Sequence, residues 1–145
     1  MTPTDLSRRM NAYQQSADNA LSKIEIVLTL YRGMLRNIDA AKAAHAARDY
    51  EEMTRLNEKT TAILVALQAN IDHEYGGEAA RNLNTFYTAV YMRLTNVLRR
   101  KDVGAEYDYI HRSVKDVYTH WYNLYRKFPE LFETAVAAGA PTDMV

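Results

Sequence analysis

Apolar residues recur at intervals of three and four from about residue 22 to residue 128, which is the spacing of amphipathic helices. Prolines stand only at Pro3, Pro129 and Pro141, so none interrupts this stretch. The pattern predicts an all-α protein, an antiparallel up-down four-helix bundle over residues 21–128. We expect a flexible N-terminal segment over residues 1–20, and at most a short, partial helix in the tail, residues 129–145.

The first two helices have recognisable starts. The sequence SKIE is a capping box, in which the Ser22 hydroxyl can accept a hydrogen bond from the backbone N–H near Glu25. Asp49 is a suitable N-cap for a second helix that reaches about His73, with the sequence ARD as the turn before it. The core stripes predicted for these helices are Ile24, Val27, Leu28, Tyr31, Leu35 and Ile38, then Met53, Leu56, Ile63, Leu67 and Ile71.

Two adjacent glycines mark the reversal into the third helix. Gly76 or Gly77 can adopt the left-handed conformation that ends the second helix, and Glu78 suits the first turn of the third. Asp102 is placed to cap a fourth helix, for which Pro129 is a natural stop. The stripes predicted here are Leu83, Phe86, Val90, Leu94 and Val97, then Val103, Tyr107, Ile110, Val114, Val117, Trp121, Leu124 and Phe128.

The four predicted helices carry apolar residues beyond the single stripe that a bundle core requires. The second helix has a row of small residues, the third has tyrosines beside its core row, and the first includes a glycine. A glycine inside a helix costs about 1 kcal/mol relative to alanine, so we expect a close backbone approach there. These additional residues are Ile26, Leu30, Gly33, Ala62, Val65, Ala66, Ala69, Tyr87 and Tyr91, with Tyr118 and Tyr122 on the fourth helix.

Two interpretations of the additional rows remain open. They can form a groove for an amphipathic helix or extended segment of another chain. Alternatively, the alanines are simply good exposed helix formers and the tyrosines fill a wide core. A third use, a constitutive homodimer, would bury the same rows.

Composition narrows the classes of function. Eighteen basic and eighteen acidic residues cancel, which argues against nucleic acid as a partner. The first twenty residues lack the apolar core of a signal peptide and no later run is long enough to span a bilayer, so we expect no membrane insertion. The chain has no cysteine, which excludes disulfides and thiolate metal sites and suits a reducing cytoplasm.

Candidate catalytic chemistry is sparse. Asp108 with His111, and Asp116 with His120, have helical spacing but lack the matching ligands that a metal-binding bundle needs. Phosphate-binding loops and nucleophile elbows are not found in the sequence, so we expect no enzyme activity, no metal and no cofactor. The alternative function is a four-helix phosphotransfer or adaptor protein that signals through an exposed His111, although HRSVK lacks the lysine-glycine step of such domains.

Four blocks of sequence resemble the family of flagellin-specific export chaperones, FliS. They are YQQ at Tyr13, SKIEIVLTLYRGML from Ser22, GGEAARNL from Gly76 followed by FYTAVYMRL, and Trp121. The resemblance covers roughly residues 12–124. Two positions depart from it: Arg32 stands where the family usually has an acidic residue, and Lys23 replaces a common proline.

The resemblance implies a cytoplasmic chaperone that binds the disordered C-terminal segment of flagellin, prevents premature polymerisation and delivers it to the flagellar export gate. It also implies that the N-terminal segment, with Tyr13, covers the empty site as a lid. The expected oligomeric state is a monomer or weak homodimer. The partner-binding residues expected from the rows and the matching blocks together are Tyr13, Ile26, Leu30, Gly33, Met34, Ala62, Val65, Ala66, Ala69, Tyr87 and Tyr91.

Overall fold

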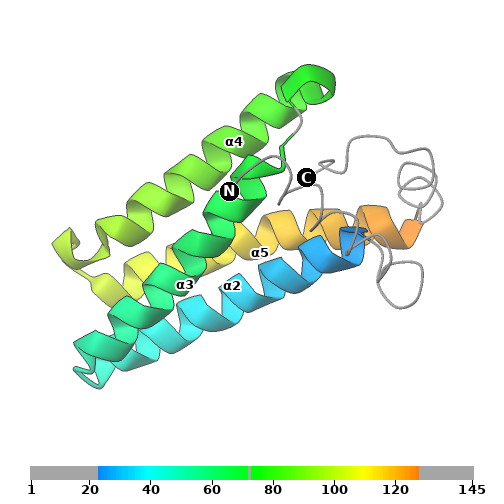
Figure 1. Ribbon diagram of the computed structural model, residues 1–145. Helices are drawn as coiled ribbons and strands as arrows, with labels where there is room; N and C mark the ends of the chain where they lie inside the picture. The colour runs from blue at the N-terminus through cyan, green and yellow to red at the C-terminus, as the bar shows by residue number, and fades with distance from the viewer. Residues whose placement is uncertain (1–22, 72, 128–145) are drawn as a thin grey trace, which may run out of the picture.

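A computed structural model describes residues 23–71 and 73–127, and within these ranges the chain forms four α-helices and one short 3-10 helix (Figure 1). Consecutive helices run antiparallel, which confirms the predicted all-α bundle. The predicted N-terminal segment, the Ser22 capping box, the stop at Pro129 and the tail lie outside the described residues. The elements are α2 (Lys23–Ala46), α3 (Tyr50–Ala69), α4 (His73–Thr95), η1 (Val97–Arg99) and α5 (Val103–Lys127).

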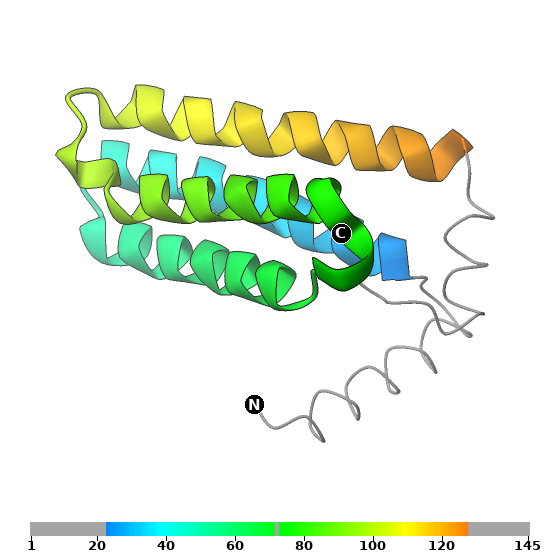
Figure 2. The same ribbon diagram turned by 90° about the horizontal axis from the view of Figure 1, so that it is seen from above.

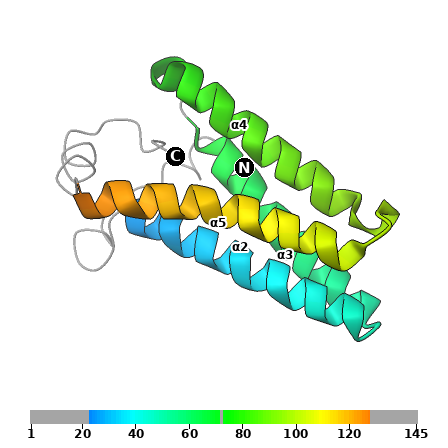
Figure 3. The same cartoon turned by 180° about the vertical axis from the view of Figure 1, so that it is seen from behind.

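Helix α2 packs along both α3 and α5, and α4 packs on α3 and, less closely, on α5 (Figures 1 and 2). Helices α2 and α4 therefore lie diagonally across the bundle, as do α3 and α5. Seen from behind, α4 diverges from α5 toward its own N-terminal end (Figure 3). None of the helices in the described ranges has the length and apolar character needed to cross a membrane.

Both diagonals are joined by tyrosine hydroxyls. The Tyr31 hydroxyl of α2 lies 2.5 Å from that of Tyr87 on α4, and both side chains are fully buried. The Tyr107 hydroxyl of α5 donates to Oδ1 of Asn57 on α3 at 3.0 Å. A polar group in the core costs stability unless it is hydrogen-bonded, and these pairs meet that requirement.

The turn between α2 and α3 has the hydrogen bonds of a Schellman motif. The Arg48 N–H donates to the His45 carbonyl at 2.9 Å and the Asp49 N–H donates to the Ala44 carbonyl at 2.8 Å. Arg48, which follows the last turn of α2, adopts the positive φ of 60° that this motif requires. The Asp49 side chain then accepts from the Glu52 N–H at 3.1 Å, which confirms Asp49 as the N-cap.

The cap predicted for the last helix is also confirmed. Oδ1 of Asp102 accepts from the Ala105 N–H at 2.9 Å, and the Asp102 carbonyl accepts from Glu106 N–H at 3.1 Å. Val97, placed in the third helix by its spacing, instead lies in η1 and is buried. It therefore reaches the core from the turn between α4 and α5.

The predicted end of the second helix is wrong. Helix α3 stops at Ala69, because the N–H groups of Asn70 and Ile71 donate to carbonyls three residues back and so tighten the last turn. The buried Ile71 side chain then holds the chain against the core. The reversal into α4 thus precedes the glycine pair.

One of the two glycines was expected to have a positive φ, and Gly77 has it. However, Gly77 lies inside α4 rather than at the end of the second helix, and its ψ differs from that of a left-handed helical residue. Its φ of 53° and ψ of −131° lie outside the left-handed helical region, and they kink α4 within its first turns. A Cβ on Gly76 would lie 2.5 Å from Cβ of Ala80, which is closer than two carbon atoms can approach. Both glycines are needed to form this kink.

Candidate protein-binding surface

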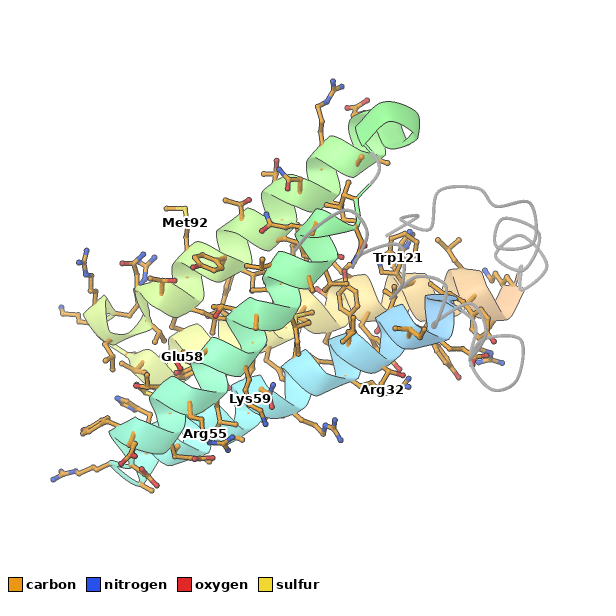
Figure 4. The ribbon with its side chains drawn as sticks, in the orientation of Figure 1. Arg32, Arg55, Glu58, Lys59, Met92 and Trp121 are labelled. Atoms are coloured by element: carbon orange, nitrogen blue, oxygen red, sulfur yellow. The ribbon has the colours of Figure 1, made fainter. Side chains whose placement is uncertain are left out.

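The C-terminal half of α3 carries an exposed apolar face. Ala62, Val65, Ala66 and Ala69 are all exposed, and Val65 retains 53% of its accessible surface. We call these four residues the α3 strip. The helix has no charged residue from Thr60 to its end, because Arg55, Glu58 and Lys59 all belong to its N-terminal half (Figure 4).

One side of the α3 strip meets α2. A Cβ on Gly33 of α2 would lie 3.7 Å from Cδ1 of Ile63 of α3, so these residues face each other. Because the helices are antiparallel, one turn back along α2 from Gly33 corresponds to one turn forward along α3 from Ile63. Leu30 and Ala66 therefore share this α2–α3 seam, and Leu30 is partly buried there.

The other side of the strip meets α4. The Gln68 side-chain amide donates to the Thr88 hydroxyl at 2.8 Å and to Oδ1 of Asn84 at 3.2 Å. Val65 is one turn before Gln68 on α3, and Tyr91 is one turn after Thr88 on α4. Val65 and the 40%-exposed Tyr91 therefore lie along this α3–α4 seam.

The predicted single groove is thus two seams, with the α3 strip between them. Leu30 and Gly33 border α3 on the α2 side, Ile26 lies one turn before Leu30 on the same helix, and each is partly buried. Tyr91 borders it on the α4 side. Since alanine projects little beyond the backbone, the strip forms a low ridge over which one partner segment could contact both seams.

Two predicted binding residues do not lie on this surface. Met34 and Tyr87 are fully buried in the core, so the expectation that they face a partner is wrong. Tyr87 is turned inward to meet the Tyr31 hydroxyl. Met34 belongs to the same buried stripe as Tyr31 and Ile38, at spacings of three and four residues. Tyr13 lies outside the described residues.

The explanation offered for Gly33 also needs correction. A Cβ on Gly33 would lie 3.7 Å from Cδ1 of Ile63, which is the distance of an ordinary van der Waals contact. The packing of α2 on α3 therefore has room for a methyl group. A close backbone approach within the bundle does not account for this glycine.

The polar members of the α3–α4 seam, Gln68, Asn84 and Thr88, were not predicted from the apolar pattern. Asn84 and Thr88 stand four residues apart, and Thr88 stands three residues before Tyr91. That spacing places all three on one face of α4 and was the available signal. Arg32, noted only as a departure from the family pattern, donates to the Tyr118 hydroxyl at 3.1 Å and so links α2 to α5.

His111 is not the exposed group that the alternative function requires. Its side chain is 25% exposed and its Nε2 lies 3.2 Å from Oδ2 of Asp39 on α2. Asp108, proposed as its neighbour in a metal-like pair, instead bonds to Lys42 at 2.7 Å. Both contacts tie α5 to α2. Within the described ranges, no three potential His, Cys, Asp or Glu ligands converge on a metal position.

The fold and this surface define the class of protein: an all-α bundle in which the C-terminal half of α3 presents an uncharged, exposed face. The family model described as "Flagellar protein FliS" matches residues 6–127 of the chain, and the chain belongs to that family. The resemblance noted in the sequence is therefore confirmed.

One similar curated protein is the "Flagellar secretion chaperone FliS" of Campylobacter jejuni subsp. jejuni serotype O:6 (strain 81116 / NCTC 11828). It is 37% identical to this chain over 78 residues. The matched region spans 54% of this chain and 61% of that relative.

Proposed function

We propose that this chain is a cytoplasmic flagellar export chaperone. It binds the disordered C-terminal segment of flagellin, prevents premature polymerisation and presents the segment to the flagellar export gate. Membership of the FliS family and the name of the Campylobacter relative support the chaperone assignment. The observation that carries the binding site is the exposed α3 strip, with Val65 at its centre.

The physical requirement is a long apolar contact. A client that is disordered when free loses conformational entropy on binding, at a cost of about 2 to 5 kcal/mol or more. Two seams on either side of the uncharged C-terminal half of α3 provide such a contact, whereas a compact pocket would hold only a few residues of the client. The client is expected to cross the α3 strip from Leu30 on one side to Tyr91 on the other.

Charge substitutions on the strip test the site. Val65→Glu and Ala66→Glu place an unpaired carboxylate under a bound apolar segment, so each should raise the Kd for a flagellin C-terminal peptide by about tenfold or more. Both positions are exposed, so unfolding free energies should change by only about 0.5 kcal/mol. Isothermal titration calorimetry and urea unfolding measure the two effects separately.

Ala43→Glu provides the matched control, because Ala43 is also an exposed helical alanine but lies near the far end of α2. It should leave the Kd unchanged. Equal affinity of all three variants and the unmodified chain would exclude the α3 strip as the client site. A stoichiometry of one peptide per chain is expected, and a doubled mass at every concentration in light scattering would favour the homodimer instead.

The lid function of residues 1–20, with Tyr13 as the covering aromatic, is part of this proposal and rests on the family resemblance. Removing residues 1–18 should raise the association rate for the flagellin peptide or increase dimer formation, because a lid competes with the client and with a second copy for the same surface. Stopped-flow fluorescence measures the first effect and light scattering the second. If neither changes, these residues have no lid function.

A further inference from the structure

A second exposed surface lies at the C-terminal end of α4, where the chain turns through η1 into α5. The 3-10 turn places the Val97 side chain in the core, whereas the next residue, Leu98, is 58% exposed. Met92, on the outer face of α4 (Figure 4), is 56% exposed. Leu98 therefore lies outside the buried core, to which Val97 contributes.

Arginine side chains at this corner are held in place by one buried carboxylate. Oε1 of Glu106 accepts from Nη1 of Arg93 at 2.6 Å, and Oε2 accepts from Nε of Arg100 at 2.7 Å. The Arg93 guanidinium also lies 4.1 Å above the centroid of the Tyr109 ring. Each guanidinium uses one nitrogen on Glu106, so other N–H groups of these partly exposed arginines remain to bind a further carboxylate.

Three further cationic side chains lie near Arg93 and Arg100. Arg99 and Lys101 flank Arg100 in the turn. Arg112 follows on α5, and its guanidinium lies 6.0 Å from the Tyr109 ring centroid. In the part of the chain described by the structure, none of these three cations forms an ion pair with an acidic side chain. The corner therefore has positive charge in excess, with an exposed leucine in the turn.

We propose that this corner, defined by Leu98, Arg99, Arg100, Lys101 and Arg93, is a second docking surface, and that it binds an acidic amphipathic segment of a partner protein. The exposed leucine supplies an apolar contact, and the pre-positioned arginines match carboxylates in the bidentate manner that lysine cannot. The site is separate from the α3 strip, which contains no charge, so the client and this partner can bind together.

Charge pattern favours a protein segment over a polyanion. Asp102 directly follows the cationic turn, and Glu106 already engages two of its arginines. A regularly spaced phosphate chain would meet these carboxylates, whereas a protein segment can place its acidic residues between them. The apolar contribution of Leu98 likewise has no counterpart on a phosphate backbone.

The probe is a short helical peptide of Leu, Ala and Glu with its leucines on one face, titrated by fluorescence anisotropy against the full chain. Binding should weaken by about tenfold or more as salt rises from about 50 to 300 mM, because exposed charges contribute to it. The same peptide with Lys in place of Glu should not bind. Amide shifts in NMR spectra should centre on residues 93–101.

Leu98→Ser and Lys101→Glu should each weaken binding of the acidic peptide by about tenfold. Lys115→Glu is the matched control, since Lys115 is an exposed lysine of α5 outside this corner, and it should have no effect. The proposal is overturned if Lys115→Glu weakens binding as much as Lys101→Glu, or if the acidic peptide does not bind at low salt. It is also overturned if single-stranded DNA or anionic vesicles bind the unmodified chain as tightly as the acidic peptide does, and bind Leu98→Ser equally well.

Neither Leu98→Ser nor Lys101→Glu should change the Kd for the flagellin peptide, and Val65→Glu should leave the acidic peptide unaffected. Failure of this second surface is thereby distinguished from failure of the flagellin site. Loss of both activities in any one of these variants would show that the two surfaces are not separate.

Discussion

The hydroxyl groups of Tyr31 and Tyr87 meet at 2.5 Å in the centre of the bundle and join two helices, α2 and α4, that are diagonal neighbours. Both rings are fully buried and their centroids are 6.3 Å apart. This contact fixes the position of α4 relative to α2. The placement of α4 in turn decides where Tyr91 lies beside the α3 strip.

Replacing one member of the pair leaves the other hydroxyl without its partner. Tyr31→Phe should lower the free energy of unfolding by about 1 to 3 kcal/mol, because the buried Tyr87 hydroxyl is then unsatisfied. Tyr87→Phe should cost less, because the Tyr31 hydroxyl keeps its hydrogen bond with Trp121. The double variant should lose less than the sum, since both polar groups are then absent. Urea unfolding of the four proteins in a double-mutant cycle gives the coupling, and additive losses would contradict a direct bond.

The same pair should make stability sensitive to alkaline pH. Burial raises the pKa of Tyr31 to about 12, an effect partly offset by hydrogen bonds to Tyr87 and Trp121, and burial also raises the pKa of Tyr87. An unfolded tyrosine loses its proton near pH 10. Between pH 10 and 12 the unfolded chain therefore binds fewer protons than the folded chain, so stability must fall as the pH rises.

Each buried tyrosine should contribute a loss of about 1.4 kcal/mol per pH unit in that window. Urea unfolding at several pH values measures the slope. The Tyr31→Phe/Tyr87→Phe double variant is the control, because its other titrating groups are the same and its slope should be shallower. Equal slopes for the two proteins would show that the phenols are not protected from ionisation.

The bundle and two helix caps were predictable from sequence, whereas the packing of side chains between helices was not. The caps at Asp49 and Asp102 were predicted because a capping side chain bonds to a backbone only three residues away. Tyr87 was misplaced because a row beside the core stripe is buried or exposed according to how wide the core is. That width is set here by its bond to Tyr31.

The division of the site into two seams could not be read from the sequence either. Val65 and Ala66 are neighbours in the chain, and periodicity showed only that both avoid the core. Their assignment to the α4 side and the α2 side depends on which helices flank α3. Gln68 and Gly33 reveal this through their contacts with Thr88 and Ile63.

Gly77 should not tolerate a side chain. Its φ of 53° with ψ of −131° belongs to a region that only glycine adopts readily, so Gly77→Ala should destabilise the protein by about 1 to 3 kcal/mol. Gly104→Ala is the matched control: a Cβ there would lie 3.6 Å from the nearest atom, and its φ is not positive. That variant should be neutral or stabilised by up to about 1 kcal/mol. Thermal unfolding compares them, and equal effects would argue against the kink.

Arg48 occupies a position that glycine would fill at lower cost. Its φ of 60° lies in the left-handed region at the end of α2, where an L side chain is disfavoured. Arg48→Gly should therefore raise the free energy of unfolding by about 0.5 to 1 kcal/mol, after the greater freedom of glycine in the unfolded chain is deducted. Arg48→Ala removes the same side chain without relieving the backbone and should not stabilise. A stabilising Arg48→Ala would assign the effect to the side chain instead.

Gly33 offers a way to separate folding from client binding. The α2–α3 seam has room for its Cβ at 3.7 Å from Ile63, so Gly33→Ala should stabilise the free protein by up to about 1 kcal/mol, the usual difference in helix propensity. If a client segment approaches the seam closely, the added methyl group should raise the Kd for the flagellin peptide by about threefold to tenfold, or about 0.7 to 1.4 kcal/mol. Stability and affinity would then change in opposite directions.

Thermal unfolding and calorimetry on Gly33→Ala and Gly104→Ala distinguish the two effects, because Gly104 lies at the start of α5, away from the seam. Gly104→Ala should leave the Kd unchanged. A stabilised Gly33→Ala with unaltered affinity would exclude close client contact at this position, whereas a destabilised one would mean that α2 and α3 pack more tightly than 3.7 Å allows. An alanine that helps the fold but hinders the client would give this glycine a functional explanation, since packing within the bundle does not require it.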